Sequence, residues 1–209
     1  PNYIIKGLIE FNLFTGGKTI LLACLCAGIS VIFCIMLHSF GKVFKTFSPN
    51  PYERVFFGGT VILCITLILG TTRYSGTGIA SAIGGTARNS DFFWKMLFTA
   101  ITLACGYKGG EIIPSFFVGA TFGCVIAPVL GLSSSLGAAI GMVSVFCGVT
   151  NCPIASLLIA LELFGKAPIL YFLLAIAISY MLSGYYSLYK TQIIAVSKYK
   201  NEYVDKKTH

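Results

Sequence analysis

Long uncharged stretches separated by short polar ones dominate the pattern of this chain. Five mainly apolar windows lack Asp, Glu, Lys and Arg, and they cover residues 19–41, 55–72, 96–107, 112–161 and 167–189. A helix that crosses a membrane needs roughly 20 mainly apolar residues. The pattern therefore predicts an all-α, multi-pass membrane protein that forms a single transmembrane domain over residues 1–209.

The fourth window, with 50 residues, is too long for one helix and carries its own breaks. Pro128 with 131–135 forms one break, and Asn151-Cys152-Pro153 forms another. Pieces of about 16, 14 and 12 residues remain, and some of these are short for a full crossing. Interrupted apolar segments of this kind indicate tilted or broken helices, which often mark a transport site.

Polar segments join these windows. Residues 73–91 are rich in Gly, Ser and Thr, so we expect a loop holding a short interfacial helix. Arg88, Asp91 and Lys95 are interpreted as charges at the membrane interface. Residues 190–209 contain five Lys against two acids, and the positive-inside rule predicts a cytoplasmic-facing basic tail.

Composition supports the membrane interpretation. The 209 residues are 56% hydrophobic and only 11% charged, whereas a soluble domain has about 25% charged residues. The apolar excess also excludes disorder. The net charge of +8 is scattered between apolar runs, so nucleic acid is not an expected partner. The eight cysteines form no C-x-x-C pair, and we interpret them as packing residues rather than metal ligands.

The segment 109–114, Gly-Gly-Glu-Ile-Ile-Pro, is the strongest candidate for a site. The two glycines permit a turn, and Pro114 suits the first turn of a helix. The free N–H groups and positive dipole end of that helix would attract an anion, most strongly away from water. The alternative is an ordinary loop that enters a membrane helix at the headgroups. Gly119 and Gly123 follow as a small-residue packing face.

Glu111 can serve either as a surface partner of the helix dipole or as a proton carrier. A carboxylate at membrane depth is costly as a charge, so it would be protonated part of the time or paired with a cation. Because like charges repel, a nearby anion would favour the protonated form. Glu111 is therefore the candidate for coupling protons to anions. No catalytic constellation accompanies it, since His38 lies at an apolar helix end and no acid–base pair is evident. We expect no enzyme activity and no cofactor.

Three motifs and a pair of apolar windows together resemble the CLC family of chloride channels and anion/proton antiporters. Residues 109–123, GGEIIPSFFVGATFG, resemble the family's G-x-F-x-P anion-binding segment, and 151–164, NCPIASLLIALELF, resemble a later helix. Residues 184–192, GYYSLYKTQ, resemble the start of the last helix, where a Tyr hydroxyl faces the central anion. The windows 19–41 and 55–72 resemble the helices that open the second half.

The resemblance implies the second inverted-repeat half of a CLC-like fold, with the N-terminal half as a missing partner. It implies a homodimer in the cell membrane, with 153–164 and 168–183 at the subunit interface. Backbone N–H groups of Glu111 and Ile112 would face the anion, and the family's tyrosine falls on Tyr189. The implied anion-binding set is Gly109, Gly110, Glu111, Ile112, Ile113, Pro114 and Tyr189.

The residue at 111 favours one branch of the family. Chloride-type members usually carry an apolar residue there, and a Gly-Gly-Glu segment resembles the fluoride/proton antiporter branch. That branch tends to carry Thr where this chain has Ile113. The resemblance therefore implies fluoride export in exchange for protons. The alternatives are a chloride/proton antiporter, a voltage-gated-type chloride channel and a cation-coupled carrier.

Overall fold

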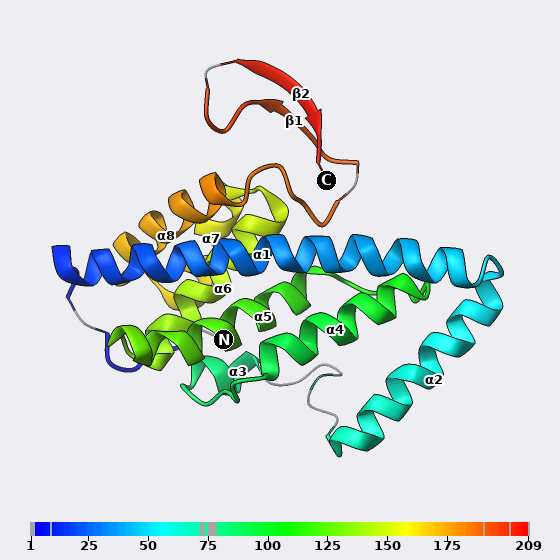
Figure 1. Cartoon of the computed structure of the whole chain (residues 1–209). Helices are drawn as coiled ribbons and strands as arrows, with labels where there is room; N and C mark the ends of the chain where they lie inside the picture. The colour runs from blue at the N-terminus through cyan, green and yellow to red at the C-terminus, as the bar shows by residue number, and fades with distance from the viewer. Residues whose placement is uncertain are drawn as a thin grey trace.

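The computed structural model describes residues 3–8, 10–71, 74, 79–189, 191–200 and 202–208 (Figure 1). Arg73 of the predicted loop, and Lys190 and His209 of the predicted tail, lie outside these residues. Among the described residues, the regular elements are helices until a small hairpin near the end. Its elements are α1 (Leu13–Phe47), α2 (Pro51–Leu69), α3 (Ile79–Ile83), α4 (Asp91–Ala104), α5 (Ile112–Ile126), the 3₁₀-helix η2 (Ala127–Leu130), α6 (Ser134–Thr150), α7 (Pro153–Phe164), α8 (Ile169–Leu182), β1 (Ile193–Val196) and β2 (Tyr203–Lys207).

Helix α1 is longer than the window 19–41 that predicts it. A capping box fixes its start, because the Thr15 amide donates to Asn12 Oδ1 at 2.8 Å and the Asn12 amide donates to Thr15 Oγ1 at 3.0 Å. The helix has 35 residues and measures about 50 Å at 1.5 Å per residue. This exceeds a hydrocarbon core of about 30 Å, so α1 tilts or extends beyond the core.

Three segments of the described chain are long and apolar enough to span a membrane. They are α1, α2 and the continuous stretch Ile112–Leu130, which joins α5 to η2. Helices α6, α7 and α8 are apolar but have only 17, 12 and 14 residues. The chain turns at Gly131, with φ of 69°, and at Asn151, with φ of 57°. Both left-handed positions fall where the sequence predicts breaks, and the prediction of broken helices is confirmed.

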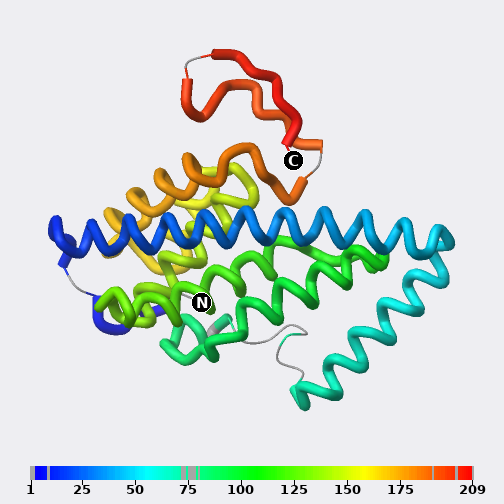
Figure 2. Tube along the Cα trace, viewed as in Figure 1, coloured from blue at the N-terminus to red at the C-terminus, as the bar shows by residue number. Residues whose placement is uncertain are grey.

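Helix α6 forms the centre of the fold. Every residue from Ser135 to Thr150 is buried, and α1, α5, α7 and α8 all pack against it. The long α1 crosses over this group and also contacts α4, as the tube in Figure 2 shows. A helix that is apolar on all sides must be enclosed by protein or lipid. Here its neighbours in the chain enclose it.

Glycines bring α5 and α6 into backbone contact. A Cβ atom at Gly119 would overlap the carbonyl oxygen of Gly141, and one at Gly123 would overlap that of Gly137. Likewise, a Cβ atom at Gly141 would overlap the carbonyl oxygen of Gly119, and one at Gly137 would overlap that of Gly123. The predicted small-residue face is thus confirmed, and it is matched by a second one on α6. Together they set the position of α5 in the fold.

Helix α2 extends away from the other helices (Figure 1). Gly58 is its one buried residue, and it lies against the side chain of Cys105. Tyr107 Oη donates to the Val55 carbonyl at 3.1 Å, and Arg54 Nε donates to the Cys105 carbonyl at 3.4 Å. Ile62, Ile65 and Leu69 pack against a cluster of Tyr74, Phe98 and Phe117. Other apolar side chains of α2 face outward, among them Phe56, Leu63, Leu67 and Ile68. Their surroundings in a membrane protein are lipid or further protein.

The segment after α8 differs from its predicted form. Residues 184–189 and 191–192 are not helical, although they resemble the start of a helix. The Leu188 amide donates to the Val149 carbonyl at 2.9 Å, and Gln192 Nε2 donates to the Thr150 carbonyl at 3.0 Å. These bonds to the end of α6 hold the segment in a non-helical path. An antiparallel hairpin of β1 and β2 follows within the predicted tail.

Lys198 connects this hairpin to the helices. Its ammonium donates to Asn151 Oδ1, to the Tyr180 carbonyl at 2.9 Å and to Ser183 Oγ at 3.1 Å. It also lies 4.3 Å from the centre of the Tyr180 ring. Burial lowers the pKa of Lys198 from 10.5 to about 8.

The docking of this hairpin is expected to depend on pH. Since the pKa of Lys198 is lower when docked than when free, docking releases a proton between pH 8 and 10.5. Docking should therefore strengthen as pH rises through that window and stay constant below it. Limited proteolysis of residues 191–208, scaled to the free peptide, should show more protection at about pH 9.5 than at about pH 7.5. Equal protection at both values would contradict this, and Lys198→Met should abolish the difference.

Candidate functional site

The start of α5 presents unpaired backbone donors. Glu111 is the N-cap residue, with φ of −91° and ψ of −20°, and its side chain makes no capping hydrogen bond. In the part of the chain that the structure describes, nothing accepts a hydrogen bond from the amides of Glu111, Ile112 or Ile113. Pro114 has no N–H. Three free N–H groups at the positive end of a 15-residue helix form an arrangement that attracts anions.

This end of α5 lies at the surface of the chain, while the rest of the helix is inside. Ile112 and Ile113 are 41% and 54% exposed, whereas Ser115 is fully buried. Glu111 is half-buried, and Gly109 and Gly110 before it are exposed. The amides are therefore accessible to an ion, and the chain itself does not enclose them.

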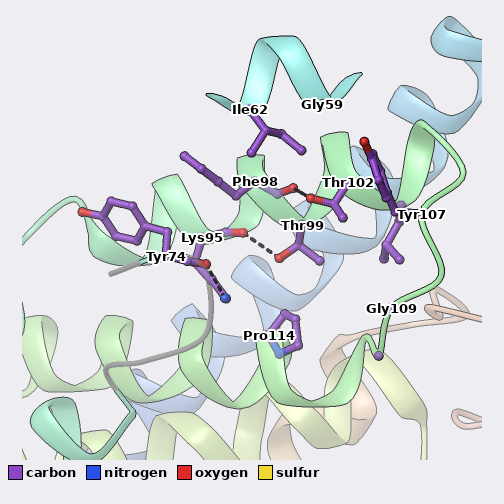
Figure 3. Close-up of a pocket in the computed structure, with 12 residues that line it drawn as sticks. Gly59, Ile62, Tyr74, Lys95, Phe98, Thr99, Thr102, Tyr107, Gly109 and Pro114 are labelled. Carbon is purple, nitrogen blue, oxygen red and sulfur yellow. Dashed lines mark hydrogen bonds between the residues drawn. The ribbon is translucent and has the colours of Figure 1, made fainter. Parts of the chain in front are cut away.

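A cavity of about 380 Å³ lies on one side of this helix start (Figure 3). Gly109, Gly110 and Pro114 line it together with residues of α2 and α4. Lys95 of α4 points into the same cavity. Its ammonium donates to the Tyr74 carbonyl at 2.6 Å and lies 5.4 Å from the centre of the Phe117 ring. A buried cation thus lies in the cavity that the anion-binding candidates line.

The prediction of Asp91 and Lys95 as interface charges is wrong. Asp91 is fully buried and Lys95 is 7% exposed. Asp91 Oδ1 accepts from the Tyr74 hydroxyl at 2.9 Å, and Asp91 Oδ2 accepts from the Arg88 amide at 3.0 Å. Burial is tolerated because each charge has hydrogen-bond partners. Arg88 itself is exposed.

A second cavity, of about 240 Å³, lies on the side of α1 and the segment after α8. Glu111, His38, Lys45 and Leu188 are among its lining residues. The structure thus brings His38 and Glu111 together, although the sequence offers no acid–base pair near His38. His38 and Glu111 are 73 positions apart in the sequence and belong to different elements, so no sequence pattern indicates that they share a cavity. The position of Lys95 in the first cavity could not be predicted for the same reason.

Tyr189 holds a less central position. It follows Leu188, which lines the second cavity, but its own side chain lines neither cavity and is 41% exposed. Its amide donates to Ser187 Oγ at 3.1 Å. The structure therefore brings the backbone of this segment to the site. The remaining predicted residues, Gly109 to Pro114, form one continuous stretch between the two cavities.

Comparison with known proteins gives matches of different extent. A chloride/fluoride channel protein of Pseudomonas syringae pv. tomato is 33% identical over 212 residues, which cover 95% of this chain and 46% of that protein. The crystal structure of a CLC-type fluoride/proton antiporter matches with a TM-score of 0.83 and 26% identity, covering 90% of this chain and 49% of that one. An uncharacterised protein of Methanocaldococcus jannaschii is 30% identical over 71 residues, or 34% of this chain and 18% of that protein. The chain spans about half the length of its two longest matches.

Spanning and broken apolar helices packed around a buried central helix define a polytopic membrane protein. The family model for the voltage gated chloride channel matches residues 2–184. The chain therefore belongs to this family, the CLC family, whose motifs were found in its sequence.

Proposed function

We propose that this chain forms half of a fluoride/proton antiporter that exports fluoride. The observation that carries the proposal is the set of free amides at Glu111, Ile112 and Ile113, beside the Glu111 carboxyl. The family, the chloride/fluoride channel relative and the antiporter structure support it. The amides bind the anion, and Glu111 carries the proton.

The chemistry of this site favours coupled transport. An ionised Glu111 repels an anion at the neighbouring amides, whereas a protonated Glu111 can donate a hydrogen bond to it. Fluoride is small and strongly hydrated, so replacing its water requires strong donors of this kind. The protonation state of Glu111 and the occupancy of the amide site are therefore coupled. Chloride is the second candidate, and Ile113 favours it because an apolar side chain offers no hydroxyl to a hydrated ion.

The complete transport path requires more protein than this chain. The free amides face the surface of the chain, and the relatives are about twice as long. We infer that a complementary half covers this site and that the assembly lies in the cell membrane. A homodimer would bury the apolar side chains that α7 and α8 expose, among them Ile154, Leu158, Leu170 and Leu173.

Ion flux from liposomes tests this function. Protein containing this chain and its complementary half is reconstituted, and efflux of fluoride or chloride is measured together with proton uptake. We expect fluoride efflux to drive protons inward, with slower chloride efflux. Proton-coupled efflux of chloride alone would indicate a chloride antiporter, and anion flux without protons a channel. Flux of sodium in place of either anion would indicate a cation-coupled carrier.

A further inference from the structure

The second cavity contains two groups that can exchange protons. His38 lies on α1 and Glu111 caps α5, and both side chains line the same space of about 240 Å³. Such a volume admits several water molecules, each of which occupies about 30 Å³ in the liquid. Both residues are half-buried, so neither is isolated from water. A short chain of water molecules can therefore connect the imidazole with the carboxyl.

The surroundings of His38 fix its position. His38 Nε2 lies 3.4 Å from the Leu188 carbonyl oxygen, and because a carbonyl only accepts, Nε2 donates in this long hydrogen bond. One turn earlier on α1, the buried Cys34 lies within electrostatic range of the Glu111 carboxyl. The side of α1 that carries Cys34 and His38 thus faces the start of α5.

The cavity holds few other titratable groups. Among the described residues that line it, these are Glu111, His38 and Lys45. The lining residues of α4 are Leu103 and Ala104, and the segment after α8 contributes Leu188. Lys45 is exposed, and burial raises the pKa of the Glu111 carboxyl, which favours its protonated form. His38 is the group here that ordinarily gains and loses a proton between about pH 5 and 8.

We propose that His38 is the proton relay between Glu111 and water on the Leu188 side of the cavity. This inference rests on the proposed proton-coupled function. In the inward step the imidazolium gives its proton, through water, to the Glu111 carboxylate, which leaves a neutral imidazole and a carboxylic acid. The imidazole then takes a proton from water at the cavity mouth. The same transfers run in reverse when Glu111 releases its proton to this side.

If His38 only positioned its neighbours, substitutions would have a different effect. If His38 only holds the Leu188 carbonyl, a side chain with an N–H donor can replace it, and glutamine has one. Glutamine cannot carry a proton at these pH values. His38→Gln therefore separates the hydrogen bond from the proton transfer, and Lys42→Gln on the exposed side of α1 is a matched control.

The test measures fluoride efflux and proton uptake in liposomes between about pH 5.5 and 7.5, with the complete transporter. We expect the wild type and Lys42→Gln to vary with pH across this range. His38→Gln should lose that variation, and its proton uptake should fall at least roughly tenfold, the scale of losing a positioned acid–base group. If His38→Gln keeps the pH profile and the rate of the wild type, the relay is wrong while the antiport stands. If the wild type itself moves no protons with fluoride, both proposals fail.

Discussion

Glu111→Gln is expected to uncouple protons from fluoride in the complete transporter. Glutamine is close in size to glutamate but carries no titratable proton, so the amides of Ile112 and Ile113 still bind an anion while the proton carrier is gone. We expect proton uptake per fluoride to fall at least roughly tenfold. Simultaneous recording of fluoride efflux with an electrode and proton uptake with a pH-sensitive dye measures this ratio.

A matched control isolates the position from the change of charge. Glu202→Gln makes the same substitution at an exposed residue of the tail, and it should leave the ratio unchanged. Unaltered coupling and unaltered fluoride preference in Glu111→Gln would remove the reason for placing this chain in the fluoride branch. Loss of all folded protein in Glu111→Gln would contradict the expected role in another way, since it would make the carboxyl structural.

Gly123→Ala is expected to have the largest effect on stability. The added Cβ would overlap the Gly137 carbonyl, which belongs to the backbone of a fully buried helix and cannot turn aside. Overpacking against side chains costs 1–3 kcal/mol, and backbone yields less, so we expect a loss of about 3 kcal/mol or more. Thermal unfolding of the detergent-purified protein, with the yield of monodisperse material, measures this effect.

Gly17→Ala is the control for this substitution. Gly17 also lies within a helix, but a Cβ there meets nothing within 4 Å. Alanine has the better helix propensity, so Gly17→Ala should be neutral or stabilise by at most about 1 kcal/mol. If both alanine variants unfold at the wild-type temperature, α5 and α6 do not depend on backbone contact at this point.

The local features of the fold could be predicted, because they depend on residues close in sequence. Proline, glycine and asparagine ended helices at Gly131 and Asn151, where the backbone has positive φ. The free amides before Pro114 also follow from local chemistry, because the first N–H groups of a helix have no partner within it. The hairpin of the tail was missed because its strands are short and β2 is charged. Lys198, between the strands, ties the hairpin to the distant residues Asn151 and Tyr180.

Burial of charge could not be predicted from the pattern alone. Asp91 and Lys95 interrupt an apolar run, and such charges usually mark the edge of a membrane helix. Their burial depends on Tyr74, which lies 17 and 21 residues earlier and accepts from one while donating to the other. The joint cavity of His38 and Glu111 likewise arises only when α1 packs beside the start of α5. Neither arrangement leaves a periodic signal in the sequence.

The glycine contacts between α5 and α6 limit how such a molecule can change conformation. Two helices joined backbone to backbone cannot slide or rotate against each other without losing that fit. In the proposed antiporter, we therefore expect the free amides at the start of α5 to keep a fixed position relative to α6. An anion would then reach these amides through the movement of side chains and neighbouring segments rather than of α5 itself.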